Sequence, residues 1–201
     1  MNGPFDAGLL GRHCRLELAD GGHVDLPIQR WIRDPGEGDE LLLTRCSGPT
    51  LDIGCGPGRL TAALAQRGVP SLGIDVSGTA VRLTRQRGGV ALRRNVFERL
   101  PGEGRWRHAL LADGNIGIGG EPVSLLRRVF EVLGPGGRAL VEVDPPGRTV
   151  RRERVRIDGS PWFPWAWLGV DALTGVALAA GLRLTWTAAH GRRHFAELMR
   201  A

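Results

Sequence analysis

A chain of 201 residues is long enough for one domain with a sizeable core, and its net charge of +6 is carried without any lysine. The arginines are scattered and not interleaved with aromatic residues, so we attribute the charge to composition and keep a nucleic-acid surface as the alternative. No apolar run reaches the roughly 18 residues of a membrane helix, and the N-terminus lacks the segments of a secretory signal. The three cysteines show no C-x-x-C spacing, so we expect a cytoplasmic protein without disulfides or a metal site.

The N-terminal part predicts a β-hairpin ahead of the main domain. Residues 1–10 show no regular pattern, so we expect a loose leader there. Residues 13–18 and 24–28 alternate apolar with polar side chains around a glycine-containing turn, as hairpin strands do. Asp39 is expected to cap a short helix over residues 40–46.

The strongest pattern in the chain is a strand, a glycine loop and a helix. Residues 50–53 predict a short buried strand, and residues 59–68 have helical spacing of apolar side chains. Three glycines at alternate positions follow the strand: Gly54, Gly56 and Gly58. Glycines let the backbone turn tightly and approach a ligand, and the helix start offers unpaired N–H groups.

A second predicted strand, residues 70–75, ends in an acid. Asp75 lies 17 residues past Gly58, near the offset of about 20 residues at which a carboxylate can bind ribose hydroxyls. A dinucleotide fingerprint would need glycine where Arg59 stands. The loop therefore suits a ligand with a ribose and no phosphates, and a nucleotide-dependent oxidoreductase is disfavoured.

Strands and helices alternate through the rest of the chain. We expect helices at residues 77–86, 121–133 and 170–180, and further strands at residues 90–92, 108–112, 138–143, 182–188 and 194–199. Residues 152–156 suggest an exposed extended segment with a stripe of arginines, and the tryptophan-rich residues 160–167 look irregular. The alternation predicts an α/β, Rossmann-like, doubly wound and mostly parallel seven-stranded sheet with an antiparallel C-terminal edge strand.

Three motifs together resemble the class I S-adenosylmethionine-dependent methyltransferases: residues 51–58 with Asp52 before the loop, residues 73–77, and residues 133–138 before a late strand. They occur in the family's order and spacing. The resemblance implies S-adenosyl-L-methionine as cofactor, S-adenosyl-L-homocysteine as product, and methyl transfer to an oxygen, nitrogen or carbon of a small-molecule acceptor. An RNA or protein methyltransferase and a cofactor-binding protein without transferase activity are the alternatives.

The same resemblance divides the single domain, residues 1–201, into three parts. These are a leader and hairpin (1–37), a cofactor-binding core (38–147), and an acceptor-side segment with a C-terminal hairpin (148–201). The oligomeric state is not predicted.

The resemblance also implies a set of cofactor-binding residues. The loop backbone would hold the methionine part, Asp75 the ribose hydroxyls, and Asn95 with Val96 the adenine, although the family usually has an acid at the Asn95 position. The set is Asp52, Ile53, Gly54, Cys55, Gly56, Gly58, Asp75, Val76, Asn95, Val96 and Asp113. Asp52 equally suits a buried carboxylate that stabilises the loop, and Asp75 a helix cap.

The acceptor side follows from the chemistry of a sulfonium. Because the positive charge already activates the methyl group, the protein chiefly supplies proximity and alignment, and we expect no metal. A base is needed only for an acceptor that must lose a proton. The catalytic candidates are Asp113, Asn115 and Asp144; the acceptor-binding candidates are Trp31, Asn115, Trp162, Phe163 and Trp165, with Arg148 in addition. The aromatic residues suit either a wall for a planar acceptor or anchors of the core.

Overall fold

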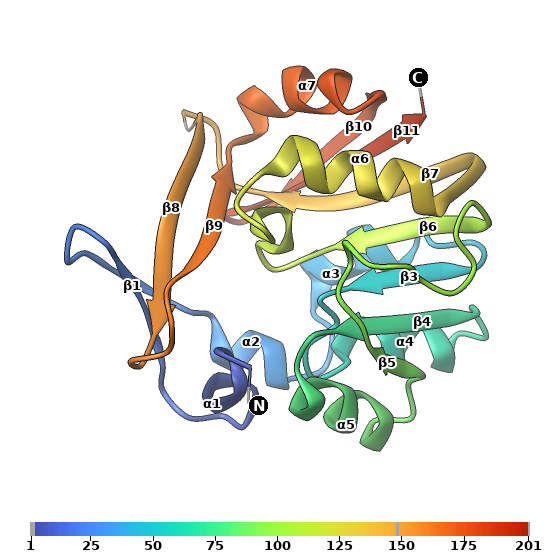
Figure 1. Ribbon diagram of the computed structural model, residues 1–201. Helices are drawn as coiled ribbons and strands as arrows, with labels where there is room; N and C mark the ends of the chain where they lie inside the picture. Colours follow the sequence, from blue (N-terminus) through green and yellow to red (C-terminus); the bar gives the residue numbers. More distant parts are fainter. Residues whose placement is uncertain (1–2, 148, 201) are drawn as a thin grey trace.

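A seven-stranded sheet forms the middle layer of the protein (Figure 1). The computed structural model describes residues 3–147 and 149–200. The helices are α1 (Asp6–Leu9), α2 (Ile28–Ile32), α3 (Glu37–Leu43), α4 (Arg59–Gln66), α5 (Gly78–Gln86), the 3₁₀ turn η1 (Asn115–Gly117), α6 (Pro122–Val132) and α7 (Val170–Ala179). The strands are β1 (Arg15–Leu18), β2 (His23–Asp25), β3 (Thr50–Ile53), β4 (Ser71–Asp75), β5 (Ala91–Arg93), β6 (Trp106–Leu111), β7 (Leu133–Val143), β8 (Val150–Ile157), β9 (Phe163–Leu168), β10 (Leu182–His190) and β11 (Arg193–Arg200).

The strand order of the main sheet is β10-β11-β7-β6-β3-β4-β5. Strands β7, β6, β3, β4 and β5 run parallel, whereas β11 runs antiparallel to both β7 and β10. The predicted fold class, a mostly parallel seven-stranded sheet with an antiparallel edge, is confirmed.

Both faces of the main sheet are covered because its strands are apolar on both sides. In β6, Ala109 and Leu111 pack into one core cluster with α6 and α7, while Leu110 packs into another with α3 and α4. Figure 1 shows these helix pairs on opposite faces of the sheet. Because these strands run in the same direction, their carboxyl ends lie at one edge of the sheet, and polar residues follow them there.

A second, four-stranded sheet of order β2-β1-β8-β9 stands beside the first, at the left of Figure 1. The predicted N-terminal hairpin is present, but β1 also pairs antiparallel with β8, register Leu16 to Ile157. The expectation of an irregular segment at residues 160–167 is wrong from residue 163 onwards, because strand β9 begins there. The expected extended arginine segment is part of β8.

The N-terminal segment is ordered, which corrects the expectation of a loose leader for residues 3–10. Helix α1 is anchored by Asp6, whose carboxylate accepts hydrogen bonds from Ser77 Oγ (2.5 Å) and Thr79 Oγ1 (2.9 Å). Residues 1–2 of that leader lie outside the described residues.

Asp39 does not cap the helix in the way expected. Helix α3 begins earlier, at Glu37, and Asp39 lies within its first turn. There the Asp39 carboxylate accepts a hydrogen bond from Gly36 N–H at 2.9 Å, so its side chain caps the backbone of the residue before the helix.

No helix in the described part of the chain is long and apolar enough to cross a membrane.

Candidate functional site

A cavity of about 660 Å³ opens at the carboxyl ends of β3, β4, β6 and β7. Residues at the ends of these strands or just after them line it, including Gly54, Asp75, Asp113 and Asp144. Its opposite wall comes from the N-terminal segment and β9. Open parallel sheets bind ligands at this edge.

The glycine loop contacts the side chain of Asn115, which follows β6, the neighbour of β3 in the sheet. Gly54 has a φ of +70°, and a Cβ there would lie 2.7 Å from Asn115 Nδ2. Asn115 Nδ2 donates hydrogen bonds to the carbonyl oxygens of Ile53 and Gly54, both at 2.9 Å. The amide nitrogen of Asn115 therefore positions the loop, and only its oxygen is left for a role toward an acceptor.

Asp75 lies at the tip of β4 with its carboxylate against the loop. Oδ2 accepts from Gly56 N–H at 3.1 Å, and Oδ1 accepts from Ser77 N–H at 2.8 Å. Burial raises the pKa of Asp75 above its ordinary value, although these two hydrogen bonds oppose the shift. The helix cap itself is Ser77, whose Oγ accepts from Ala80 N–H at 3.0 Å. Asp75 lines the cavity, and its carboxylate has further lone pairs that can accept hydroxyl hydrogens.

Asp52 points away from the loop amides. Its carboxylate, 3% exposed, accepts a hydrogen bond from Thr61 Oγ1 at 2.6 Å. Burial raises the pKa of Asp52 to about 6, with the Thr61 hydrogen bond opposing the shift. Asp52 thus ties β3 to helix α4, and the structure contains no hydrogen bond from the loop N–H groups to its side chain among the described residues.

At the other end of the cavity, Asn95 and Val96 follow β5. Asn95 Oδ1 accepts from Phe97 N–H at 3.1 Å, which leaves the amide N–H₂ group of Asn95 as the donor available to a ligand. Val96 is buried, and Phe97 is 45% exposed at the rim. Val76, next to Asp75, also lines the cavity.

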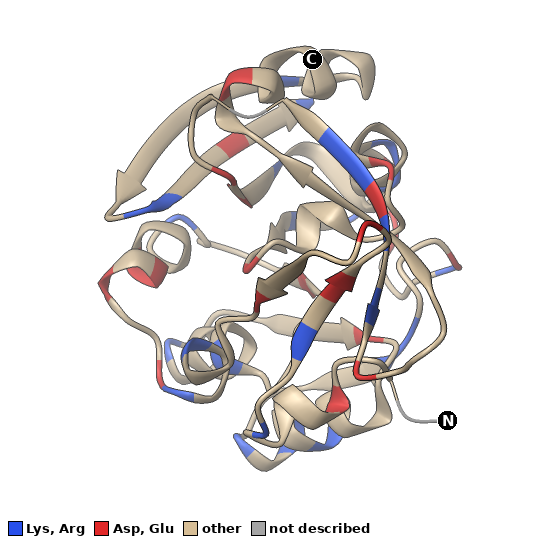
Figure 2. Ribbon diagram, turned by 90° about the vertical axis from the view of Figure 1, so that its left-hand side faces the viewer, with Lys and Arg blue, Asp and Glu red and all other residues tan. Residues whose placement is uncertain are grey.

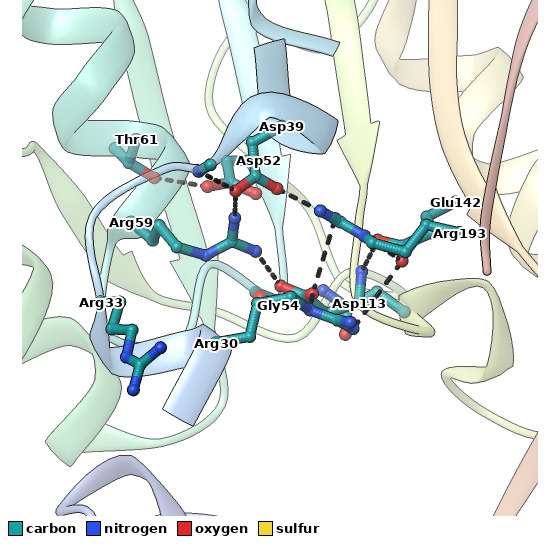
Figure 3. Close-up of polar contacts among 12 residues, drawn as sticks. Arg30, Arg33, Asp39, Asp52, Gly54, Arg59, Thr61, Asp113, Glu142 and Arg193 are labelled. Carbon is teal, nitrogen blue, oxygen red and sulfur yellow. Dashed lines mark hydrogen bonds and ion pairs between the residues drawn. The ribbon is translucent and has the colours of Figure 1, made fainter. Parts of the chain in front are cut away.

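Beside the glycine loop lies an ion-pair network that joins five elements of the chain (Figure 3). Its members are Arg30, Asp39, Arg59, Asp113, Glu142 and Arg193. Arg59, 3% exposed, pairs with both Asp39 and Asp113. Arg193 donates to Asp39 at 2.9 Å and to the two oxygens of Glu142 at 2.8 and 2.9 Å. Arg30 Nε donates to Asp113 at 2.8 Å.

The network is balanced in charge, three guanidinium groups against three carboxylates. Burial acts to raise the pKa of Asp39 and Glu142, but the neighbouring arginines outweigh it and hold both below their ordinary values. Both oxygens of Asp113 are engaged, one by Arg30 and one by Arg59. A role for Asp113 as a general base finds no support in this arrangement.

The remaining wall of the cavity is aromatic and aliphatic. Phe5, Trp31, Phe163 and Trp165 form one cluster, with ring centroids between 5.6 and 6.2 Å apart. Trp31 carries a buried indole N–H that has no hydrogen-bond partner among the described residues. The lining of this half of the cavity is therefore mainly aromatic and aliphatic.

Most predicted site residues line the cavity: Trp31, Asp52, Ile53, Gly54, Cys55, Gly56, Asp75, Val76, Asn95, Val96, Asp113, Asn115, Asp144, Phe163 and Trp165. Two described residues do not. Gly58 packs α4 against α5, where a Cβ would lie 2.6 Å from Thr84 Cα. Trp162 is 36% exposed, and its ring stacks on Arg156. Arg148 lies outside the described residues.

The structure adds residues that the sequence did not single out. Arg30, Glu142 and Arg193 of the network are separated by more than 50 residues from some of their partners, so no local pattern pairs them. Phe5 belongs to the segment that was expected to be a loose leader, so it was not considered as a site residue. Arg59 is the one network residue that the sequence marked as unusual, because it stands where a dinucleotide-binding fingerprint has glycine.

The arginine stripe of β8 is partly neutralised. Figure 2 shows basic and acidic residues interspersed over this side of the molecule. Arg152 pairs with Glu121 at 2.8 Å, and Arg156 pairs with Glu17 at 2.6 Å. These pairs reduce the positive potential that a nucleic-acid surface requires.

Comparison with known proteins identifies the type of domain. Residues 50–137 match the family model of a methyltransferase domain. No curated protein sequence matches the chain.

Solved structures share the fold. A SAM-dependent methyltransferase from Bacteroides fragilis, in complex with S-adenosyl-L-homocysteine, has a TM-score of 0.81 at 20% identity, with 98% of this chain and 94% of that chain covered. The CcbJ methyltransferase from Streptomyces caelestis has a TM-score of 0.66 at 20% identity, with 85% and 92% covered. A 1,6-didemethyltoxoflavin-N1-methyltransferase from Burkholderia thailandensis has a TM-score of 0.62 at 20% identity, with 81% and 74% covered.

Proposed function

The chain carries a methyltransferase domain on the fold of the class I S-adenosylmethionine-dependent methyltransferases, as its sequence predicted, and from this premise we propose its activity. The protein transfers the methyl group of S-adenosylmethionine to a small-molecule acceptor in the cavity described above. The cofactor supplies an electrophilic methyl group on a sulfonium.

The observation that carries this proposal is the juxtaposition of the glycine loop and Asp75. A Cβ at Gly56 would meet only Leu9 Cδ2, at 3.6 Å, so the backbone is accessible there, and the Asp75 carboxylate lies beside Gly56 on the same cavity. We assign the methionine part to the backbone of Gly54–Gly56, the ribose hydroxyls to Asp75, and the adenine to Asn95 and Val96. The fit suits a nucleoside without phosphates.

A small-molecule acceptor is supported by the shape and charge of the opposite wall. Aromatic residues of α2 and β9 enclose that half, and the arginines beside it are engaged in ion pairs. The Burkholderia enzyme of the same fold was solved with 1,6-didemethyltoxoflavin, a small molecule. We assign the acceptor side to the segments before residue 38 and after residue 147, and we keep the cytoplasm as the expected compartment.

Calorimetric titration with S-adenosylmethionine, S-adenosylhomocysteine and NAD tests the cofactor. We expect the first two to bind and NAD not to bind; the reverse pattern would refute the proposal. Incubation of metabolite pools with labelled methyl donor then tests transfer. Label that appears only in RNA or protein would favour those acceptors, and cofactor binding without any transfer would indicate a binding protein.

A further inference from the structure

The acceptor half of the cavity presents aromatic rings at regular spacing. Phe163, Trp165 and Trp167 alternate along β9, so they share one face of the strand and all three line the cavity. Phe5 closes the cluster from the N-terminal side, 5.6 Å from Trp165 and 5.8 Å from Phe163. Apolar side chains of the hairpin and of the segment that follows it, Leu16, Val24 and Leu26, complete this wall.

These rings are held in place by the two sheets. Strand β9 pairs with β8 over its whole length, and Trp165 forms a bridge to Ile118 next to η1. The backbone of Gly117 passes so close that a Cβ there would lie 2.1 Å from the carbonyl oxygen of Ala166. A wall of aromatic rings held in this way favours aromatic ligands, because stacked or edge-to-face ring pairs gain about 0.5–1.5 kcal/mol beyond the area they bury.

The groups available for proton transfer are few. Among the described residues that line the cavity there is no histidine, and the chain contains neither tyrosine nor lysine. The only cysteine there is Cys55, and burial raises the pKa of its thiol well above the ordinary value. The titratable lining therefore consists of carboxylates and arginines.

These carboxylates already interact with other groups of the protein, Asp25 and Asp144 included. Asp52 binds Thr61, Asp75 binds two backbone N–H groups, and Asp113 and Glu142 belong to the ion-pair network. A carboxylate is in any case a weak base, with an ordinary pKa of about 4. It takes a proton from an acidic ring hydroxyl more readily than from an aliphatic alcohol or an alkylammonium ion, because general-base catalysis depends on the difference in acidity.

We propose that the methyl acceptor is a planar ring compound whose nucleophile is available without an enzymic base: the anion of an acidic ring hydroxyl, or an unprotonated ring nitrogen. The inference rests on the proposed function and names its substrate class. The acceptor's electron pair forms the new bond to the methyl carbon, and the carbon–sulfur bond breaks with its electrons going to sulfur. A ring oxyanion yields a neutral methyl ether, and the sulfonium becomes a neutral thioether, so no proton moves.

Binding of model compounds tests the ring preference. Protein saturated with S-adenosylhomocysteine is titrated by calorimetry with hydroxynaphthalenes and hydroxyquinolines, and with decalinols and decahydroquinolines of matched size. We expect the planar compounds to bind and the saturated ones not to bind. Binding of the saturated compounds alone, equal binding of both sets, or binding of neither would overturn the proposal. Failure of S-adenosylhomocysteine itself to bind would refute the proposed function instead.

Two tryptophans in the same segment provide a matched pair of variants. Trp165→Leu removes a ring from the cavity, and Trp162→Leu removes one outside it. We expect Trp165→Leu to raise the dissociation constant of the planar compounds about tenfold, and Trp162→Leu to leave it within about twofold. Affinity for S-adenosylhomocysteine should be unchanged in both, which shows that both are folded. Equal effects of the two variants on the planar compounds would contradict the assignment of the wall.

The rate of transfer tests the nucleophile. With labelled S-adenosylmethionine, kcat/KM is measured against pH for phenols made progressively more acidic by chloro and nitro groups. We expect the midpoint of each profile to follow the acidity of the phenol used. One midpoint common to all phenols would indicate an enzymic base and contradict the proposal, as would binding of the whole planar panel without transfer to any member.

Discussion

Asp75 combines a structural and a proposed ligand-binding role in one carboxylate. Its two oxygens each accept one backbone N–H, and their remaining lone pairs are the acceptors we assign to the ribose. Asp75→Asn keeps the size of the side chain but replaces one acceptor oxygen with a donor. We expect affinity for S-adenosylhomocysteine to fall by roughly 1–3 kcal/mol in calorimetry. Asp25→Asn, in the opposite wall, is the control, and an unchanged affinity of Asp75→Asn would remove Asp75 from the site.

His108 is the residue whose titration should be visible in folding. It is 1% exposed in β6, and its Nε2 accepts from Ser47 N–H at 3.2 Å, so it is neutral. Burial, with nearby arginines, lowers the pKa of His108 to about 4 from 6.5. Above pH 6.5 both states are neutral; as the pH falls toward 4, only the unfolded chain gains the proton. Stability is therefore lost over this interval, by up to about 3 kcal/mol at about 1.4 kcal/mol per pKa unit.

The pH dependence of His108→Gln tests this assignment. Urea unfolding at pH 7 and pH 4.5 should show a smaller loss of stability for the variant than for the wild type. The comparison with the wild type is necessary because the pKa of Asp52, raised to about 6, acts in the opposite direction. Below pH 6 the folded state takes up that proton first, which stabilises it. Identical pH profiles for variant and wild type would show that His108 titrates normally.

Single residues were predictable where their role is local. The glycine spacing and the acid at the end of a strand are features of neighbouring residues, and from them Gly54 and Asp75 were predicted as site residues. Both residues line the cavity. Asn115 was predicted as a catalytic and acceptor-binding residue and not as a support of the glycine loop, because its bonds to Ile53 and Gly54 span 62 and 61 residues. Contacts between residues so far apart in the sequence cannot be predicted from a local sequence pattern.

At the scale of the elements, Gly58 packs helix α4 against helix α5. Its φ is +84°, and a Cβ there would lie 2.6 Å from the backbone of α5 at Thr84. Gly68, after α4, has a φ of +72° with nothing within 4 Å of a Cβ. Alanine at either position is strained by about 1 kcal/mol in the left-handed conformation. Gly58→Ala should lower the free energy of unfolding by about 2 kcal/mol more than Gly68→Ala, because its Cβ clashes with α5. Equal losses of stability for the two variants in urea unfolding would contradict this, because they would show that α5 shifts to make room for the added methyl group.

Periodicity predicted the main elements but not their partners. Strands of the parallel core and helices α4 to α7 were expected at nearly their observed positions, since their apolar spacing is strong. Strand β9 was missed because prolines and tryptophans obscure its alternation, which is visible only once Phe163, Trp165 and Trp167 lie on one face. The pairing of β1 with β8 joins segments more than 130 residues apart, and register over that distance is set by packing.

For the molecule as a whole, the ion-pair network ties the N-terminal helices to the C-terminal strand. Arg59→Met would leave Asp39 and Asp113 buried without one of their cations, so we expect a loss of about 3–5 kcal/mol in urea unfolding. Arg67→Met, at the other end of α4, removes an exposed pair with Glu40 and should lose less than about 1 kcal/mol. Similar small losses for both would mean that the network does not stabilise the fold.

The central claim is that the glycine loop and Asp75 together hold an adenosyl sulfonium facing an aromatic wall. A crystal structure of the protein with S-adenosylhomocysteine tests it most directly. We expect the homocysteine part along Gly54–Gly56, both ribose hydroxyls within hydrogen-bond distance of Asp75, and the sulfur open to the half of the cavity lined by Trp31 and Trp165. The ligand bound elsewhere, or with its ribose away from Asp75, would contradict this account.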